Sequence, residues 1–291
     1  MHLGILFAFG ALLFWGFGDF FIQKTTRTIG TWKALFCITA LGSVVLLFFI
    51  RQELLRTSPH HLALLGLVSL ITLFAALFDF EALKRGKIAI VEPVIGLELP
   101  ITVGLGIFIW HENVTSWQLF CIALIFIGIL LTITEHHTHL HYHKRLFEKG
   151  VLFAGIGAIG MALVNFTTGV ASQETSPLLT IWFVHTFLAL MSGGYLCITG
   201  DMRTLWRDCK RHPCTVAAQS ILDNLAWISY ASATTLIPIA VTTAISESYI
   251  ILASTLGILL NKEKLQSHQF LGVALTTVTV VTLAWLTNVG G

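Results

Sequence analysis

The sequence has few charged residues, and this shortage excludes most soluble folds. Only 11% of its 291 residues are Asp, Glu, Lys or Arg, whereas a soluble domain usually carries about 25%. Hydrophobic residues make up 55% of the chain, so its polar side chains cannot cover a water-soluble globule. The bilayer is therefore the expected solvent. A net charge of +2 gives no reason to expect a nucleic-acid partner.

Catalytic motifs are also missing from the sequence. It contains no nucleophile elbow, zinc-protease motif or phosphate loop, and its five cysteines form no CxxC pair. A GxGxxG pattern at 155–160 lies inside an apolar run with no strand before it. We interpret these glycines as positions of close helix packing. The rival class, a membrane-embedded enzyme, needs a nucleophile or a group of metal ligands, and we find neither in the sequence. We therefore expect no enzymatic activity and no cofactor.

Long apolar runs are what the chain has in abundance. A membrane-spanning helix needs about 20 mostly apolar residues, and these runs are too long and alternate too little in polarity for barrel strands. The sequence predicts an all-α integral membrane fold, one compact membrane domain of ten transmembrane helices at residues 3–23, 31–50, 62–83, 88–109, 117–134, 150–171, 178–199, 213–235, 238–260 and 269–287.

The two halves of the chain resemble each other. Residues 4–8 (GILFA) match residues 150–154 (GVLFA), and Glu112 with its loop neighbours matches Glu263. Each half holds an odd number of spans, so the second half must enter the membrane from the opposite side. We therefore predict two inverted five-helix repeats, which are typical of secondary transporters, at 1–145 and 146–291.

Basic residues are distributed unevenly between the two sides of the membrane. Of the 17 Lys and Arg residues, only Arg51 and Arg56 fall on one side, and the remaining 15 fall on the other. The positive-inside rule makes the rich side cytoplasmic. The chain is thus predicted to be a multi-pass protein of the cell (inner or plasma) membrane with both termini extracytoplasmic.

The end of the fourth span carries a resemblance to a known family. The turn at 110–115 (WHENVT) follows Pro93 and the run 104–106 (GLG), and its counterpart in the second half is 261–266 (NKEKLQ). Together with the duplication, this pattern resembles the EamA-type transporters of the drug/metabolite transporter (DMT) superfamily over the whole chain. The resemblance implies a duplicated ten-helix fold and a central cavity lined in part by the fourth and ninth helices. It is silent on substrate.

Two features depart from that family's pattern. His111 and Lys262 stand where a glycine often precedes the turn glutamate. Members of the family usually keep both termini in the cytoplasm, which is opposite to the orientation that the loop charges predict.

Acidic residues are the informative feature of the predicted spans, whose only Lys or Arg is Lys33, near the start of the second span. An ionisable group at the bilayer centre costs roughly 2.5–3.5 kcal/mol even on a lenient scale. Such acids therefore need a wet cavity, a place at a span end, or a proton. The spans hold seven of them: Asp19, Asp79, Glu81, Glu92, Glu98, Asp223 and Glu247.

Three acids lie deepest. At about 1.5 Å per residue, Glu98, Asp223 and Glu247 are roughly 14–15 Å along their helices, near the midplane of a core about 30 Å thick. Pro93 and Pro100 bracket Glu98, so we expect a kinked helix with free carbonyls there. We predict that these acids bind substrate or a coupling proton. The alternative is that they are protonated and capped by neighbouring helices.

The shallower acids are expected to have mixed roles. Glu81 and Arg85 have the i, i+4 spacing of a helix-end ion pair, and Asp79 is expected to share Lys84 or Arg85 in the same way. Glu92 lies at the mouth of the fourth span, where an entrance role and an interfacial role are both open.

Two roles are open for Asp19, a place in the cavity and a contact with Lys24, which a loop at the end of the first span would bring within reach. The counterpart of Asp19 on the repeat register is Asn165, which keeps a polar group at the matching place.

Aromatic residues accompany these acids. Asp223, Trp227 and Tyr230 share one helix face, and Trp15 lies one turn from Asp19. Acids with aromatic walls suit an organic cation, and the alternative is an interface belt or helix packing. The predicted substrate- and proton-binding residues are Glu98, Glu247, Asp223, Asp19, Asn165, Trp15, Trp227, Tyr230 and Tyr249, the last being the counterpart of Glu98.

A histidine-rich loop is the one local oddity of the sequence. We interpret it as a solvated, pH-sensitive linker. The alternative is a site for Zn²⁺, Ni²⁺ or Cu²⁺, which would make the protein a metal-ion transporter or a metal-responsive membrane sensor. The five histidines are His136, His137, His139, His141 and His143.

The sequence therefore predicts a secondary active transporter. It would move a small polar or cationic metabolite (an amine, amino acid or drug) by alternating access, coupled to protons through its intramembrane carboxylates. Its expected partners are the substrate, a proton and the lipid bilayer. It is expected to be a monomer or homodimer.

Overall fold

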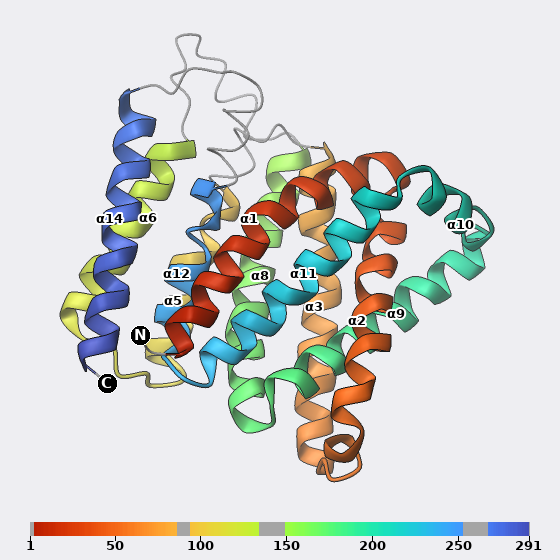
Figure 1. Ribbon diagram of the computed structural model, residues 1–291, viewed down its shortest axis with the longest axis horizontal. Helices are drawn as coiled ribbons and strands as arrows, with labels where there is room; N and C mark the ends of the chain where they lie inside the picture. Colours follow the sequence, from red (N-terminus) through yellow and green to blue (C-terminus); the bar gives the residue numbers. More distant parts are fainter. Residues whose placement is uncertain (1–2, 86–93, 134–148, 253–266, 291) are drawn as a thin grey trace.

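The computed structural model describes residues 3–85, 94–133, 149–252 and 267–290. These residues are almost entirely helical and contain no strand, which agrees with the predicted all-α class (Figure 1). The helices are α1 (Leu3–Ile29), α2 (Thr31–Leu54), α3 (Pro59–Arg85), α5 (Glu98–Phe108), α6 (Ser116–Ile133), α8 (Lys149–Glu174), α9 (Pro177–Thr199), α10 (Met202–Arg211), α11 (Pro213–Thr234), α12 (Ile239–Ser246) and α14 (Ser267–Gly290).

Six of the described helices are long and apolar enough to cross a membrane, namely α1, α2, α3, α8, α9 and α14. The remaining predicted spans correspond to α11, which carries more polar residues, and to the shorter helices α5, α6 and α12. The chain is thus a multi-pass membrane protein, while the count of ten spans stays a prediction.

The helices pack in pairs drawn from the two halves of the chain. The most extensive contacts join α1 to α11, α3 to α8, α2 to α9 and α6 to α14, and α5 packs against α12. Figure 1 shows α6 and α14 side by side at one end of the molecule and α10 at the other. The two termini lie on the same edge of the molecule.

Small residues allow a close contact between α3 and α8, as the GxGxxG pattern predicted. A Cβ added to Gly160 of α8 would lie 2.9 Å from the Cβ of Ala75 in α3, and one added to Gly157 would lie 3.4 Å from the Cα of Asp79. The backbones of α3 and α8 therefore approach closely beside Asp79.

The first helix is longer than the sequence predicted. It runs to Ile29 instead of ending near residue 23, because its polar last turns satisfy themselves: the Thr26 hydroxyl donates to the Ile22 carbonyl at 2.9 Å and the Thr28 hydroxyl to the Lys24 carbonyl at 2.9 Å. Asp19 consequently lies in the body of α1, not in a loop beside Lys24.

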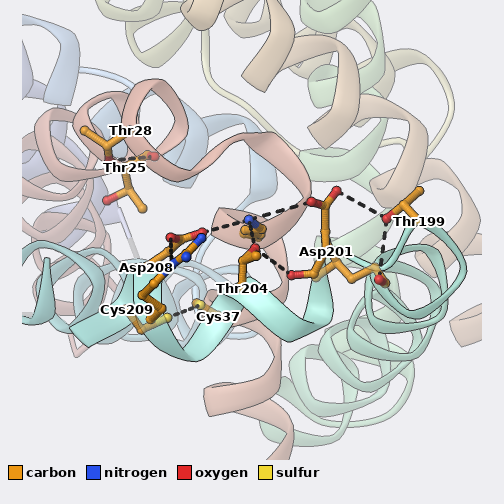
Figure 2. A network of polar contacts seen from close by, with 11 residues as sticks. Thr25, Thr28, Cys37, Thr199, Asp201, Thr204, Asp208 and Cys209 are labelled. Atoms are coloured by element: carbon orange, nitrogen blue, oxygen red, sulfur yellow. Dashed lines mark hydrogen bonds and ion pairs between the residues drawn. The ribbon is translucent and has the colours of Figure 1, made fainter. Parts of the chain in front are cut away.

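A short polar helix, α10, fills what the sequence suggested was a loop around residues 201–212. Lys33 of α2 fastens it: the ammonium donates to Asp208 at 2.8 Å and to Thr204 at 2.7 Å, and lies 3.9 Å from Asp201. Figure 2 shows Asp201, Thr204 and Asp208 around this network, with Cys209 beside Cys37. The α2–α10 contact is therefore held by matched charges.

The turn glutamate of the 110–115 segment joins the two halves of the chain. Glu112 accepts hydrogen bonds from the backbone N–H groups of Ile239 and Ala240 (2.9 Å for Ala240), so its carboxyl caps the start of α12. Trp110 donates to Gln173 at 2.8 Å, which in turn donates to the Thr234 carbonyl at 2.7 Å.

Candidate functional site: an acid-lined cavity

A central cavity of about 100 Å³ lies between the two halves of the chain. Its walls come from α1, α2, α3, α5, α8, α9 and α11 and from the segment that follows α12. No Lys or Arg is among the described residues that line it. The acids that line it are Asp19, Asp79, Glu98, Asp223 and Glu247.

The two best-placed acids lie at breaks in helices. Residues 96–97 form a turn, and α5 begins at Glu98, so the predicted kink between Pro93 and Pro100 is a break. Glu247 directly follows the last residue of α12. In the next turn, Ile250 donates its N–H to the Glu247 carbonyl at 3.2 Å, a tighter i, i+3 pattern. Both carboxyl groups are thereby carried into the cavity, and both are buried.

The carboxyl groups of Glu98 and Glu247 are direct neighbours. They are close enough to hydrogen-bond to each other, and Asp79 lies near both of them. Carboxyl groups this close repel each other unless a proton or a cation lies between them. The arrangement can therefore hold a proton, a cation, or first one and then the other.

Asn165 of α8 completes this group. Its Nδ2 donates to Glu247 Oε1 at 3.3 Å. Its own Oδ1 and the second Glu247 oxygen, Oε2, are buried without a hydrogen-bond partner among the described residues. Buried acceptors without donors cost free energy, so a hydrogen-bond donor or a proton beside these two oxygens would be favourable.

Three of the four predicted aromatic residues line the cavity, and one does not. Trp15, Trp227 and Tyr249 line the cavity, and the rings of Trp15 and Trp227 meet edge to face at 5.0 Å. Tyr230 is fully buried and is not among the lining residues. Its hydroxyl lies 2.8 Å from the Thr243 hydroxyl and donates to the Asn165 carbonyl at 3.1 Å. Tyr230 therefore positions Asn165 and does not form part of the wall.

Among the Asp, Glu and His residues that line the cavity, two were not predicted as site residues. Asp79 was expected to share Lys84 or Arg85 near the end of its helix, but Lys84 pairs with Glu81 at 3.5 Å, and Asp79 lines the cavity. His185 of α9 also lines the cavity, and its Nδ1 lies 3.0 Å from Oδ1 of Asn224 in α11. The sequence places Asp79 near the end of the third span, which gave the ion-pair reading its weight. The His185–Asn224 contact joins two helices and has no local signal.

The other acids and the histidines singled out in the sequence are not among the described residues that line the cavity. Glu81, which was expected to pair with Arg85, pairs with Lys84 at 3.5 Å and accepts a hydrogen bond from Thr31 at 3.1 Å. Glu92 and the histidines at 136–143 lie outside the described residues. Within the described ranges, no group of three or more His, Cys, Asp or Glu is placed to hold a metal ion.

Comparisons with known proteins agree with this architecture. A family model described as EamA-like transporter family matches residues 2–134 and 148–285. A solved structure described only as "Crystal structure of protein" aligns with 98% of this chain and 97% of its own, with a TM-score of 0.73 at 15% identity, which is a likeness of fold alone.

Two known proteins are similar to parts of this chain in sequence. The chain is 27% identical over 161 residues to Cation/H(+) antiporter 18 of Arabidopsis thaliana, which covers 51% of this chain but only 20% of that protein. It is 28% identical over 131 residues to Uncharacterized protein MJ1333.1 of Methanocaldococcus jannaschii, which covers 44% of this chain and 92% of that protein.

Proposed function

Because this chain belongs to the EamA-like transporter family, and is thus a multi-pass membrane transporter of the DMT superfamily, we propose that it is a secondary active transporter of small polar or cationic metabolites. The observation that carries this proposal is the central cavity, where five carboxyl groups gather and no Lys or Arg lies among the described lining residues. Acids at membrane depth are expensive and usually functional.

Proton coupling follows from the Glu98–Glu247 contact. A proton held between the two carboxyl groups removes their repulsion when the cavity contains no substrate. A cation that enters the cavity takes over that role and releases the proton, so one site serves both ions in turn. This competition is the physical basis of cation-for-proton exchange. The name of the Arabidopsis relative, a cation/H(+) antiporter, agrees with such an exchange, although this chain spans only a fifth of that protein's length.

Alternating access rests on two inverted five-helix repeats, residues 1–145 and 146–291. The family model matches one segment in each half, and the helix contacts run between the halves. Inverted repeats around a midplane site allow one half to rock against the other. The Glu112 cap on α12 and the Lys33 contact with α10 each join the two halves of the chain, so each would have to adjust when one half rocks against the other.

The orientation is proposed from the charge bias of the loops, with both termini outside the cytoplasm. That the two termini share one edge is consistent with an even number of spans (Figure 1). A C-terminal reporter that is active only in the cytosol tests the orientation: we expect no signal, and a strong signal contradicts it.

Transport by proteoliposomes tests the function. Guanidinium, tetramethylammonium and a neutral amino acid are supplied outside vesicles with an acidic interior, and the accumulated solute is measured with and without a protonophore. We expect cation accumulation that the protonophore abolishes, and that Glu98→Gln reduces by about tenfold or more, as expected for a lost charge-assisted interaction. Accumulation that ignores both the pH gradient and this substitution contradicts the proposal.

A further inference from the structure

Asn224 in α11 has a fixed amide orientation. Its Nδ2 donates to the Ile38 carbonyl of α2 at 3.0 Å and to the Ser220 carbonyl at 2.7 Å. A carbonyl oxygen can only accept a hydrogen bond, so the NH₂ group must face these two atoms. The amide oxygen, Oδ1, therefore faces His185.

This orientation decides the tautomer of His185. Its Nδ1 lies 3.0 Å from Asn224 Oδ1, which is an acceptor, so Nδ1 carries the hydrogen and donates. The ring is 4% exposed, and its sole hydrogen-bond partner among the described residues is this neutral amide. Burial against a neutral group favours the uncharged ring. In that ring Nε2 is a bare acceptor, and it belongs to a side chain that lines the cavity.

The backbone leaves little room for any other arrangement. A Cβ added to Gly42 of α2 would lie 2.0 Å from Asn224 Oδ1 and 2.3 Å from His185 Nδ1. The absence of a side chain at this position lets α2 approach the His185–Asn224 pair and hold it in place.

The cavity offers acceptors in excess. Besides His185 Nε2, the oxygen Asn165 Oδ1 has no partner among the described residues, and five carboxyl groups line the same cavity. The hydroxyls of Thr39 and Thr72 donate to the carbonyls of their own helices at 2.8 Å each. A ligand that satisfies this wall must therefore bring N–H donors as well as positive charge.

We propose that His185 is a specificity-determining residue whose Nε2 accepts a hydrogen bond from the N–H group of a small ammonium or guanidinium substrate, with Asn224 as the residue that fixes its tautomer. The proposal rests on the proposed transport function and narrows its substrate class. A volume of about 100 Å³ favours small ligands, and a fully methylated cation, which has no N–H, cannot make the bond.

Binding of matched cation pairs tests this assignment. Each pair has the same charge and differs in N–H content: methylammonium with tetramethylammonium, benzylammonium with benzyltrimethylammonium, and guanidinium with hexamethylguanidinium. Dissociation constants are measured by tryptophan fluorescence on the purified full-length protein, since Trp15 and Trp227 line the cavity. We expect the N–H partner of at least one pair to bind about tenfold tighter or more, which is the range for a hydrogen bond to a charged group.

Two substitutions test the acceptor atom of His185, Nε2, separately from the contact between Nδ1 and Asn224. In His185→Asn, the amide nitrogen takes the place of Nδ1 and keeps the bond to Asn224, but no acceptor reaches the Nε2 position. In His185→Gln, the longer amide restores a polar group there. We expect the preference for N–H cations to fall to about twofold or less in His185→Asn and to return in part in His185→Gln. Thermal unfolding of both variants verifies that each is folded.

Each result decides the assignment. Equal binding of both members of every pair, a preference that His185→Asn leaves intact, or binding of none of these cations overturns it. Proton-driven transport in the proteoliposome assay is measured separately. Cation transport without a preference for N–H cations therefore contradicts the role of His185 alone. Cation binding without proton-driven transport contradicts the proposed function.

Discussion

At the α2–α10 contact, Lys33 meets Asp208 at 2.8 Å and Thr204 at 2.7 Å, whereas the cavity gathers five carboxyl groups without a Lys or Arg among its described lining residues. In the first arrangement, the charge of Asp208 is paired by a basic residue of the protein. In the second, the charges of the carboxyl groups need a proton or a cation from outside the protein. The difference indicates that an acid inside a membrane protein is functional when no Lys or Arg nearby pairs with it.

Asp79 and Glu81 sharpen this comparison most, because they are two residues apart on α3 and belong to the two classes. Asp79 lines the cavity, and Glu81 pairs with Lys84 and Thr31. We expect Asp79→Asn to lower proton-driven cation transport by about tenfold or more, since it removes a charge from the cation site. Initial uptake rates in proteoliposomes measure the effect.

Glu81→Gln is the matched control for that substitution. The Glu81–Lys84 pair is partly exposed to solvent, and exposed ion pairs contribute about 0–1 kcal/mol. We expect uptake to change by less than about fivefold. Equal losses in both variants would show that the cavity does not distinguish the two acids.

The sequence predicted part of this contrast and missed part of it. Pro93 and Pro100 predicted a broken helix at Glu98 because proline removes a helical hydrogen bond. The equivalent break after α12 has no proline near Glu247, and it depends on i, i+3 bonding that the sequence does not reveal. Asp79 was assigned to an ion pair because helical spacing identifies which residues are neighbours along a helix, but not which face meets the partner helices.

Long-range contacts explain the other omissions. His185 and Asn224 lie on different helices, so only the packing of α2, α9 and α11 brings them together. Tyr230 shares a helical face with Asp223 and Trp227, yet α8 and α12 bury it and use its hydroxyl. In both cases residues of the right kind are visible in the sequence, while tertiary packing decides which of them reach the cavity.

Gly42 provides the next test, on stability. A methyl group there would collide with the Asn224 amide and the His185 ring. We expect Gly42→Ala to reduce the free energy of unfolding by about 1–3 kcal/mol, the usual cost of overpacking. The midpoint of thermal unfolding in detergent measures the loss.

Gly66 of α3 is the control for that substitution, because a Cβ added there meets nothing within 4 Å. Alanine is the better helix former by about 1 kcal/mol, so we expect Gly66→Ala to leave the midpoint unchanged or to raise it. A Gly42→Ala protein as stable as Gly66→Ala would mean that the His185–Asn224 pair is not held by α2.

The smallest expected effect lies at the α2–α10 contact, outside the membrane. Lys33 donates to Asp208 and holds the pKa of that carboxyl below its usual value. A lowered pKa in the folded state means that Asp208 contributes stability above its unfolded pKa of about 3.9, and that this contribution is lost as the pH falls through the folded value. We expect Asp208→Asn to cost about 1 kcal/mol or less at pH 7, as is usual for such pairs.

Unfolding of the wild-type protein and of Asp208→Asn at pH 7 and at pH 3.5 checks that sign. The gap between the two proteins should narrow at the lower pH, because the wild-type carboxyl begins to take up a proton and loses its attraction for Lys33. High salt at pH 7 should narrow it as well, since the pair is partly open to solvent. A gap that widens at low pH would contradict the structural role of this pair and, with it, the distinction between matched charge on α10 and unmatched charge in the cavity.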